Sequence, residues 1–182
     1  MVERAMELLK VKLMDWAEGW LLNLRQEYRA VARALTDEEA ASLRGYFGQD
    51  LLSRVRVAPV ERISNPGFFG ALPQLGVPVP WDFSAEPGLS VVDTIVMSRA
   101  LIAEDAWVSV LFEECVHIQQ FQTLGISRLV SRYVNTLFSN GFDYRNLPME
   151  QQARELRMRF DAGLKAFSVE QIVETALLKG AI

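Results

Sequence analysis

The chain contains the stretch Phe112-Glu113-Glu114-Cys115-Val116-His117-Ile118-Gln119-Gln120, in which acids and the single histidine stand among large apolar residues. We expect a helix over residues 104–124, because helical spacing continues through this window and the glycine that follows is suited to a C-terminal cap. Residues three or four positions apart share one face of a helix. The predicted helix therefore carries Glu113, Glu114 and His117 on a common face, while its apolar residues fasten it into the core.

This arrangement is one exchange away from a zinc-binding helix. In the motif H-E-x-x-H, two imidazoles four residues apart hold Zn²⁺ and the glutamate between them polarises a metal-bound water. Here Glu113 stands where the first imidazole belongs, followed by Glu114 and His117 in their usual places. A third ligand has to come from elsewhere, and Glu150, in the first turn of a later predicted helix, is the candidate.

The segment from Asp93 to Phe160 resembles a group of small bacterial zincin-like metallopeptidases. Those proteins show a strand G-D-T-I-V-V, a helix F-H-E-L-V-H-V-x-Q-Y-x-x-L-G and a segment G-x-x-Y-x-x-x-P-x-E-x-x-A. The corresponding stretches in this chain are Val92–Met97, Phe112–Gly125 and Gly141–Ala153. The resemblance implies a zincin-like fold in which His117 and Glu150 are metal ligands and Glu114 is the general base. Glu113 departs from the family pattern at a ligand position.

The exchange at Glu113 changes the chemistry expected of the site. A carboxylate in place of a neutral imidazole adds negative charge, so ions harder than Zn²⁺, such as Mn²⁺ or Fe²⁺, become more favourable. We predict a divalent metal held by Glu113, His117 and Glu150, with Glu114 as the catalytic residue of a divergent hydrolase of peptide or amide bonds. If no metal binds, the three acids crowd together, and at least one must be protonated or turn outward.

Less specific interpretations of the same residues stay open. The chain could be a catalytically inactive zincin-fold module that binds or regulates a partner through the old cleft, with His117 a hydrogen-bonded core residue. The order E-x-x-H is also half of a di-iron signature, but that site needs a second such element and the chain has one histidine. Cys115 lies two residues from His117, on a different side of the helix, which favours a buried inert thiol over a nucleophile.

Apolar periodicity over residues 3–34 predicts one long amphipathic N-terminal helix, in which Gly19 is a point of possible bending. The fold class expected is therefore α+β, a helix-rich zincin-like domain with a small β-sheet and this long helix in front. We divide the chain into residues 1–35, the N-terminal helix packed on the body, and residues 36–182, a single zincin-like globular unit.

Local signals predict the remaining elements. Thr36-Asp37-Glu38-Glu39 has the order of a capping box that starts a short helix. We expect strands over residues 54–60 and 89–97, the first with Pro59 at its end or at a sheet edge. The aromatic, proline-rich segment 65–87 could form the wall of a cleft. Further helices are predicted over residues 127–139, over residues 148–162 with proline in the first turn, and from Ser168.

Composition limits the classes of partner that the chain is expected to bind. The net charge of −4 gives no general attraction to nucleic acid, and the arginines at 154, 157 and 159 fit a solvated helix face of mixed charge. No run of eighteen apolar residues occurs, so we expect no membrane span. The single cysteine favours a cytoplasmic location. The expected partner is a peptide or small-molecule substrate, and the sequence leaves the oligomeric state open.

Overall fold

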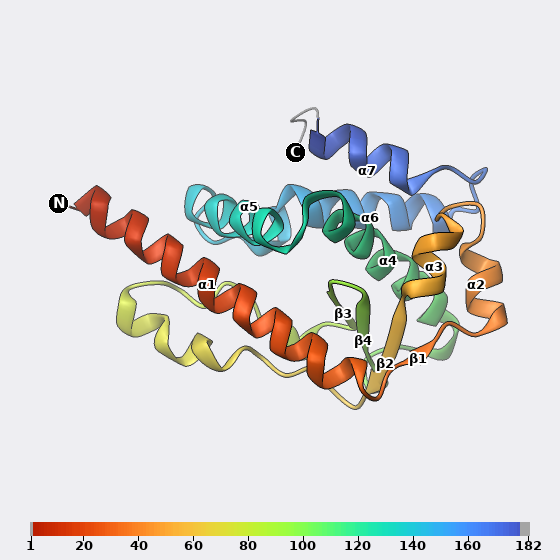
Figure 1. Cartoon of the computed structure of the whole chain (residues 1–182), viewed down its shortest axis with the longest axis horizontal. Helices are drawn as coiled ribbons and strands as arrows, with labels where there is room; N and C mark the ends of the chain where they lie inside the picture. Colours follow the sequence, from red (N-terminus) through yellow and green to blue (C-terminus); the bar gives the residue numbers. More distant parts are fainter. Residues whose placement is uncertain (1, 179–182) are drawn as a thin grey trace.

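Helices dominate the fold and surround a small sheet (Figure 1). The structure is a computed structural model that describes residues 2–178. The helices are α1 (Val2–Arg29), α2 (Asp37–Leu43), α3 (Gln49–Arg54), α4 (Trp107–Leu124), α5 (Ile126–Ser139), α6 (Pro148–Asp161) and α7 (Val169–Leu178). The predicted class, a helix-rich α+β chain with a small sheet and a long N-terminal helix, is confirmed. None of the described helices is both long and apolar enough to cross a membrane.

The sheet is mixed, with strand order β1-β2-β4-β3. Its strands are β1 (Arg33–Ala34), β2 (Arg56–Val60), β3 (Gly88–Val91) and β4 (Thr94–Ser98). Strand β4 is parallel to β2 and antiparallel to β3, and every one of its residues is buried. The two-residue strand β1 pairs only with Val57 and Arg56, so β2 has a free edge at Pro59, as the missing N–H of proline requires.

The single strand predicted over residues 89–97 is wrong, because the chain reverses at Val92 and Asp93 to form the β3–β4 hairpin. Val92 adopts φ +62°, a region that β-branched residues rarely enter. The turn is fastened from outside: Arg25 donates two hydrogen bonds of 2.8 Å to the carboxylate of Asp93, and Arg29 lies 3.1 Å from it. Contacts with α1 therefore hold a turn that its own sequence does not favour.

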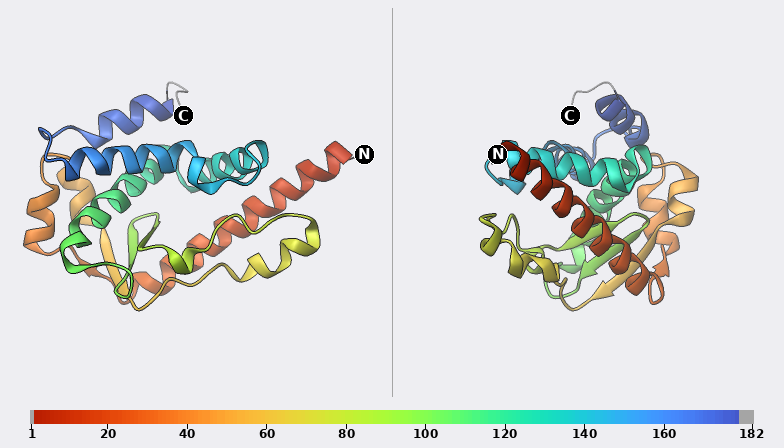
Figure 2. Two further views of the ribbon diagram at one scale, coloured as in Figure 1. Left: turned by 180° about the vertical axis from the view of Figure 1, so that it is seen from behind. Right: turned by 60° about the vertical axis from the view of Figure 1, so that its left-hand side comes forward.

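Helix α1 is continuous through Gly19 and ends at Arg29, earlier than predicted, because residues 33–34 join the sheet as β1. Its buried leucines belong to the main core. Tryptophans on the same apolar face contact the irregular segment, with ring centroids 5.9 Å apart for Trp16 and Phe68 and 5.4 Å apart for Trp20 and Phe83. Segment 65–87 runs beside α1 in both views of Figure 2 and contains short 3₁₀ turns.

Local capping signals place the other helices well. Thr36 and Glu39 form both bonds of the predicted capping box, 3.1 Å from the Glu39 amide to the hydroxyl and 2.7 Å from the Thr36 amide to the carboxylate. Pro148 occupies the first turn of α6, and the Ser168 hydroxyl accepts from the Gln171 amide at the start of α7. Helix α3 was not predicted, because its six residues carry no cap or periodic signal.

We predict that Asp93→Ala lowers the free energy of unfolding by about 2 kcal/mol, since hydrogen bonds to charged groups are worth about 1.5–3 kcal/mol each. Burial works to raise the pKa of Asp93, but the hydrogen bonds and charge of Arg25, together with the charge of Arg29 and the hydroxyl of Thr94, outweigh burial and lower it. A lowered carboxyl pKa stabilises the fold above the unfolded value, so the difference between wild type and variant should shrink as pH falls through 3.8. Urea unfolding at pH 7 and pH 3 measures both.

The matched control is Asp50→Ala, which removes an exposed ion pair with Arg54 and should cost less than about 0.5 kcal/mol. Equal losses in the two variants would contradict a structural role for the hairpin turn.

Candidate acid-base site

Helix α4 runs through the middle of the structure and carries Glu113, Glu114 and His117, the site residues predicted for it. It contacts β3, β4, α5, α6 and α7, and Phe112, Cys115, Val116 and Ile118 on it are completely buried. A polar group on such a helix reaches neither bulk water nor a distant partner. Its ionisable side chains must therefore be satisfied by the elements packed around it or face a cavity.

One large cavity opens along this helix. Its volume is about 930 Å³, and its walls come from α1, α5 and segment 65–87, with α4 and α6 at one end. The prediction that segment 65–87 could wall a cleft is confirmed, since Phe68, Trp81 and Phe83 line the cavity. Glu113, Glu114, His117 and Glu150 all line its polar end. We call this space the chamber.

Gln120 fixes the orientation and tautomer of His117. The amide nitrogen of Gln120 donates to the backbone carbonyl of Met149 and to Oε1 of Gln152, both at 3.0 Å. A carbonyl only accepts, so the oxygen of Gln120 is the atom that faces Nδ1 of His117, at 2.9 Å. Nδ1 therefore carries a proton, and Nε2 is directed at Glu150, whose Oε2 lies 3.8 Å away. This separation is too long for a hydrogen bond.

Two tyrosines hold the carboxylate of Glu150. The hydroxyl of Tyr133 donates to Oε1 at 2.6 Å, and that of Tyr144 donates to the same atom at 3.0 Å. Burial, with the charge of Glu150 next, raises the pKa of both phenols well above the ordinary value, so both remain donors at neutral pH. Oε1 is thus engaged, and Oε2 is the atom that faces the imidazole.

Glu114 lies in a pocket that suits a neutral carboxyl group. The Ser90 hydroxyl is 2.7 Å from the backbone oxygen of Glu114 and 2.8 Å from its Oε2, and one hydroxyl proton cannot serve both. A protonated Glu114 donates to Ser90 and leaves the serine proton for the backbone oxygen. Burial raises the pKa of Glu114 to about 7, helped by Glu113 and Glu150 and opposed by His117 and Ser90. Near neutral pH the group can give or take a proton.

The strand next to Glu114 leaves room for it only because residue 88 is glycine. A Cβ atom on Gly88 would lie 2.5 Å from Oε1 and 2.7 Å from the carboxyl carbon of Glu114. Real Cβ atoms do not approach so closely, so any larger residue would displace the carboxyl group. The start of β3 therefore fixes where Glu114 projects.

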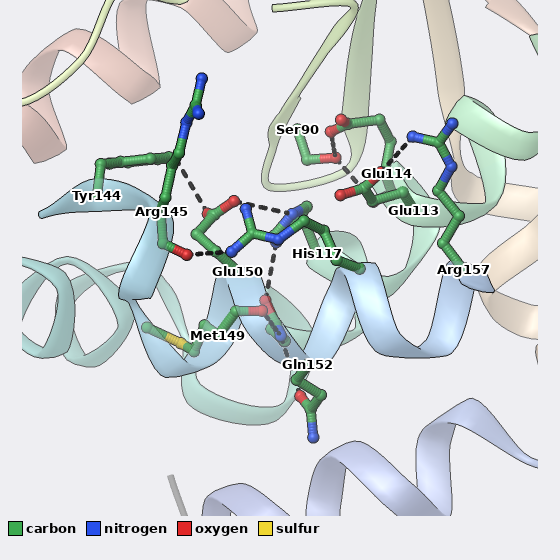
Figure 3. A network of polar contacts seen from close by, with 12 residues as sticks. Ser90, Glu113, Glu114, His117, Tyr144, Arg145, Met149, Glu150, Gln152 and Arg157 are labelled. Atoms are coloured by element: carbon green, nitrogen blue, oxygen red, sulfur yellow. Dashed lines mark hydrogen bonds and ion pairs between the residues drawn. The ribbon is translucent and has the colours of Figure 1, made fainter. Parts of the chain in front are cut away.

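Glu113 is paired with an arginine. Nη1 of Arg157 lies 2.7 Å from Oε2 of Glu113, and Nε of Arg157 donates to the hydroxyl of Ser109 at 2.7 Å. The interpretation of Arg157 as part of a solvated mixed-charge face is wrong, because α6 packs along α4 and turns this arginine inward (Figure 3). Asp161, on the same helix, also lies beside Arg157, with its carboxylate 3.6 Å from Nε.

The structure brings all four predicted site residues together. Burial alone would lower the pKa of His117, but the charges of Glu150, Glu114 and Glu113 outweigh burial and raise it. The raised pKa of His117 favours a second proton, which would be carried on Nε2. The sequence pattern identified these four residues because helix spacing fixes three of them and a proline-started helix presents the fourth.

The donor atoms fit a metal ion only in part. Nε2 of His117 and Oε2 of Glu150 face each other, which suits two ligands of one ion, and the fixed Nδ1 proton is typical of ligating histidines. Glu113 is held by the Arg157 cation instead of completing the set. Within residues 2–178, no three His, Cys, Asp or Glu side chains are arranged to hold a metal. A metal at Glu113, His117 and Glu150 stays a prediction, and it requires Glu113 to leave Arg157.

Several functional residues were missed from the sequence. Gln120 and Tyr144 lie inside the stretches that carried the zincin resemblance, so their positions were a usable signal. Ser90, Tyr133 and Arg157 come from other elements, at no regular spacing from α4. Cys115 is buried, and burial raises the pKa of its thiol, as an inert core cysteine requires.

No protein family model, no curated protein and no solved structure matches this chain. The resemblance to zincin-like metallopeptidases thus rests on the quoted motifs. The geometry of the chamber is therefore the basis for assigning a function.

We predict that the stability advantage of wild type over Glu114→Gln falls as pH rises from 4.5 to 7. The pKa of Glu114 is raised in the folded chain, so the folded state binds its proton more tightly and loses that advantage as pH approaches the folded pKa of about 7. The change should be on the order of 3 kcal/mol, at about 1.4 kcal/mol per pKa unit. Urea unfolding across this pH range measures it, and a pH-independent difference would contradict a buried neutral carboxyl group.

We predict that Glu113→His combined with Arg157→Ala binds Zn²⁺ at least about 100-fold more tightly than wild type, because an imidazole replaces a paired carboxylate and the competing cation is removed. Calorimetric titration with Zn²⁺ measures this. Arg157→Ala alone is the control, since it frees Glu113 without adding an imidazole. Unchanged affinity in the double variant would show that positions 113, 117 and 150 do not converge.

Proposed function

We propose that the chain is a divergent hydrolase of zincin descent that cleaves a peptide or amide bond in the chamber, with Glu114 as the residue that transfers the proton. The observation that supports it is a buried carboxyl group with a pKa of about 7 in the wall of a large cavity, beside an oriented histidine. General acid-base catalysis is most effective when the catalytic pKa lies near the working pH. Perturbed groups of this kind cluster at functional sites.

The proposed reaction uses this group twice. Ionised Glu114 takes a proton from water as the water oxygen bonds to the substrate carbonyl carbon. The C–N bond then breaks, and Glu114 gives the proton to the leaving nitrogen. The products are a carboxylic acid and an amine, and the enzyme returns to its starting state. Water is the co-reactant, and Glu114 is the residue of the chain that carries the proton between the two steps.

The other residues support this proton transfer. Protonated His117 would offer Nε2–H to the oxygen that becomes negative when the carbonyl is attacked. Glu150, held by two tyrosines, favours that protonated imidazole and keeps the ring aimed at the cavity. Ser90 fixes one oxygen of Glu114 and leaves the carboxyl group poised near the start of β3.

The second candidate is a binding or regulatory module without catalysis. One observation favours it: the Glu113–Arg157 pair satisfies a carboxylate at the position of a family ligand. A chamber with apolar walls could then hold a ligand while its acids serve only to position it.

We place either function in the cytoplasm, which the single buried thiol favours.

The decisive experiment is a turnover screen with fluorogenic peptides and amides at pH 7, with wild type and Glu114→Gln compared after both are shown to fold. We expect turnover by wild type and a loss of about 100-fold or more in the variant, the usual contribution of a general acid-base group. Glu104→Gln, an exposed glutamate just before α4, is the matched control and should retain wild-type rates.

Equal rates in wild type and Glu114→Gln would overturn the assignment of Glu114. A folded wild type that binds panel members in the chamber but cleaves none, with or without added Zn²⁺ or Mn²⁺, would favour the binding module.

A further inference from the structure

The two ends of the chamber differ in chemistry. The lining from α1 and α5 includes Leu13, Ala17, Trp20, Val130, Val134 and Leu137, and none of the described residues that these two helices contribute is charged. A volume of about 930 Å³ lies within the range of small-molecule sites. The chamber as a whole has room for an extended hydrocarbon chain or several apolar side chains.

The other end is rich in carboxylates. Glu86, just before β3, lines it together with Glu113, Glu114 and Glu150. Burial raises the pKa of Glu86, the indole N–H of Trp81 and the charge of Arg145 lower it, and the charges of Glu150 and Glu113 raise it. Glu86 makes no ion pair within the described part of the chain. The acids at this end thus repel one another, and a positive group placed among them would relieve that repulsion.

The nearby arginines are already engaged. Arg157 is shared by Glu113 and Asp161. The guanidinium of Arg145 lies over the ring of Trp81, 5.2 Å from its centroid, and Arg154 donates to the backbone oxygen of Arg145. Arg145 still acts on Glu86, since its charge lowers the pKa of that carboxyl group, and His117 faces the same acids. Among the described lining residues, the acids Glu86, Glu113, Glu114, Glu150 and Asp161 outnumber the arginines Arg145, Arg154 and Arg157. The polar end therefore has carboxylate charge left for a ligand.

Aromatic rings form part of the wall beside the acids. Trp81 and Tyr144 are stacked, with centroids 4.8 Å apart, and both line the chamber. Arg145 already lies over the ring of Trp81, so the attraction for a ligand cation comes from the carboxylates. Tyr144 also donates to Glu150, so ring and carboxylate lie next to each other at the polar end (Figure 3).

We infer that the chamber takes an extended apolar chain bearing a primary amine, with the chain between α1 and α5 and the ammonium group at Glu86 and Glu150. This deepens the proposed function, on which it rests for the reaction: the substrate would be an amide whose apolar part carries a free amine. An apolar peptide with a free α-amine and a simple alkylamine both have this chemistry.

Binding by calorimetry at pH 7 tests the inference without any turnover. The first probes are octylamine, octanol and octanoate, used below their micelle concentrations. We expect octylamine to bind at least about tenfold more tightly than the other two, since complementary charge favours it and like charge opposes octanoate. Trileucine amide against its N-acetyl form distinguishes a peptide source from an alkylamine source of the same amine.

Variants locate the site. Ala17→Trp fills the apolar end and should weaken octylamine binding at least about tenfold, whereas Leu22→Trp, on an exposed part of the same helix, should not. Leu137→Trp is the second filling variant, on α5, if the first fails to fold. Glu86→Gln should reduce the preference for octylamine over octanol at least about threefold while octanol binding stays unchanged.

Octanoate binding as tightly as octylamine, no binding of either, or filling variants with wild-type affinity would each overturn the inference. Amine preference without amide cleavage would leave this inference standing and overturn the hydrolase. Cleavage without amine preference would do the reverse.

Discussion

The burial of α4 is the constraint on which the rest of the structure depends. This helix is packed against the sheet and against α2, α5, α6 and α7, yet it carries Glu113, Glu114 and His117. An isolated buried charge is costly, so each group needs a partner from a neighbouring element. Ser90 from β3 and Arg157 and Glu150 from α6 supply them. The elements that pack around α4 are thus the same ones that supply partners for its polar groups.

The partners that each acid receives determine which chemistry the site can perform. Two adjacent acids on one buried helix cannot both be charged at low cost, and the structure separates them. Glu113 is paired with a guanidinium, while Glu114 is placed against a serine that suits its neutral form. Tyr133 and Tyr144 leave one oxygen of Glu150 directed at His117. The result is a proton donor, an oriented imidazole and a carboxylate around one end of an apolar chamber.

The parts of this arrangement that sequence can predict are local. Helices α4, α5 and α6 and the capping box of α2 follow from periodicity and end signals, and the spacing within α4 unites three site residues. The turn at Val92 was not predictable, because it lies within a run of β-branched residues that favours a continuous strand. The arginines of α1 that stabilise the turn are distant in sequence. Arg157 was misjudged for a similar reason. Its partner lies on another helix, and only packing decides which face is buried.

The most direct test is the titration of Glu114 itself. Glutamate side chains labelled with ¹³C at the carboxyl carbon can be followed by NMR across pH 3–9, with Glu114→Gln to assign the resonance. The structure predicts one carboxyl resonance that titrates near pH 7 and is absent from the variant. If every glutamate titrated close to the ordinary value of 4.5, the buried proton donor at the centre of this interpretation would not exist.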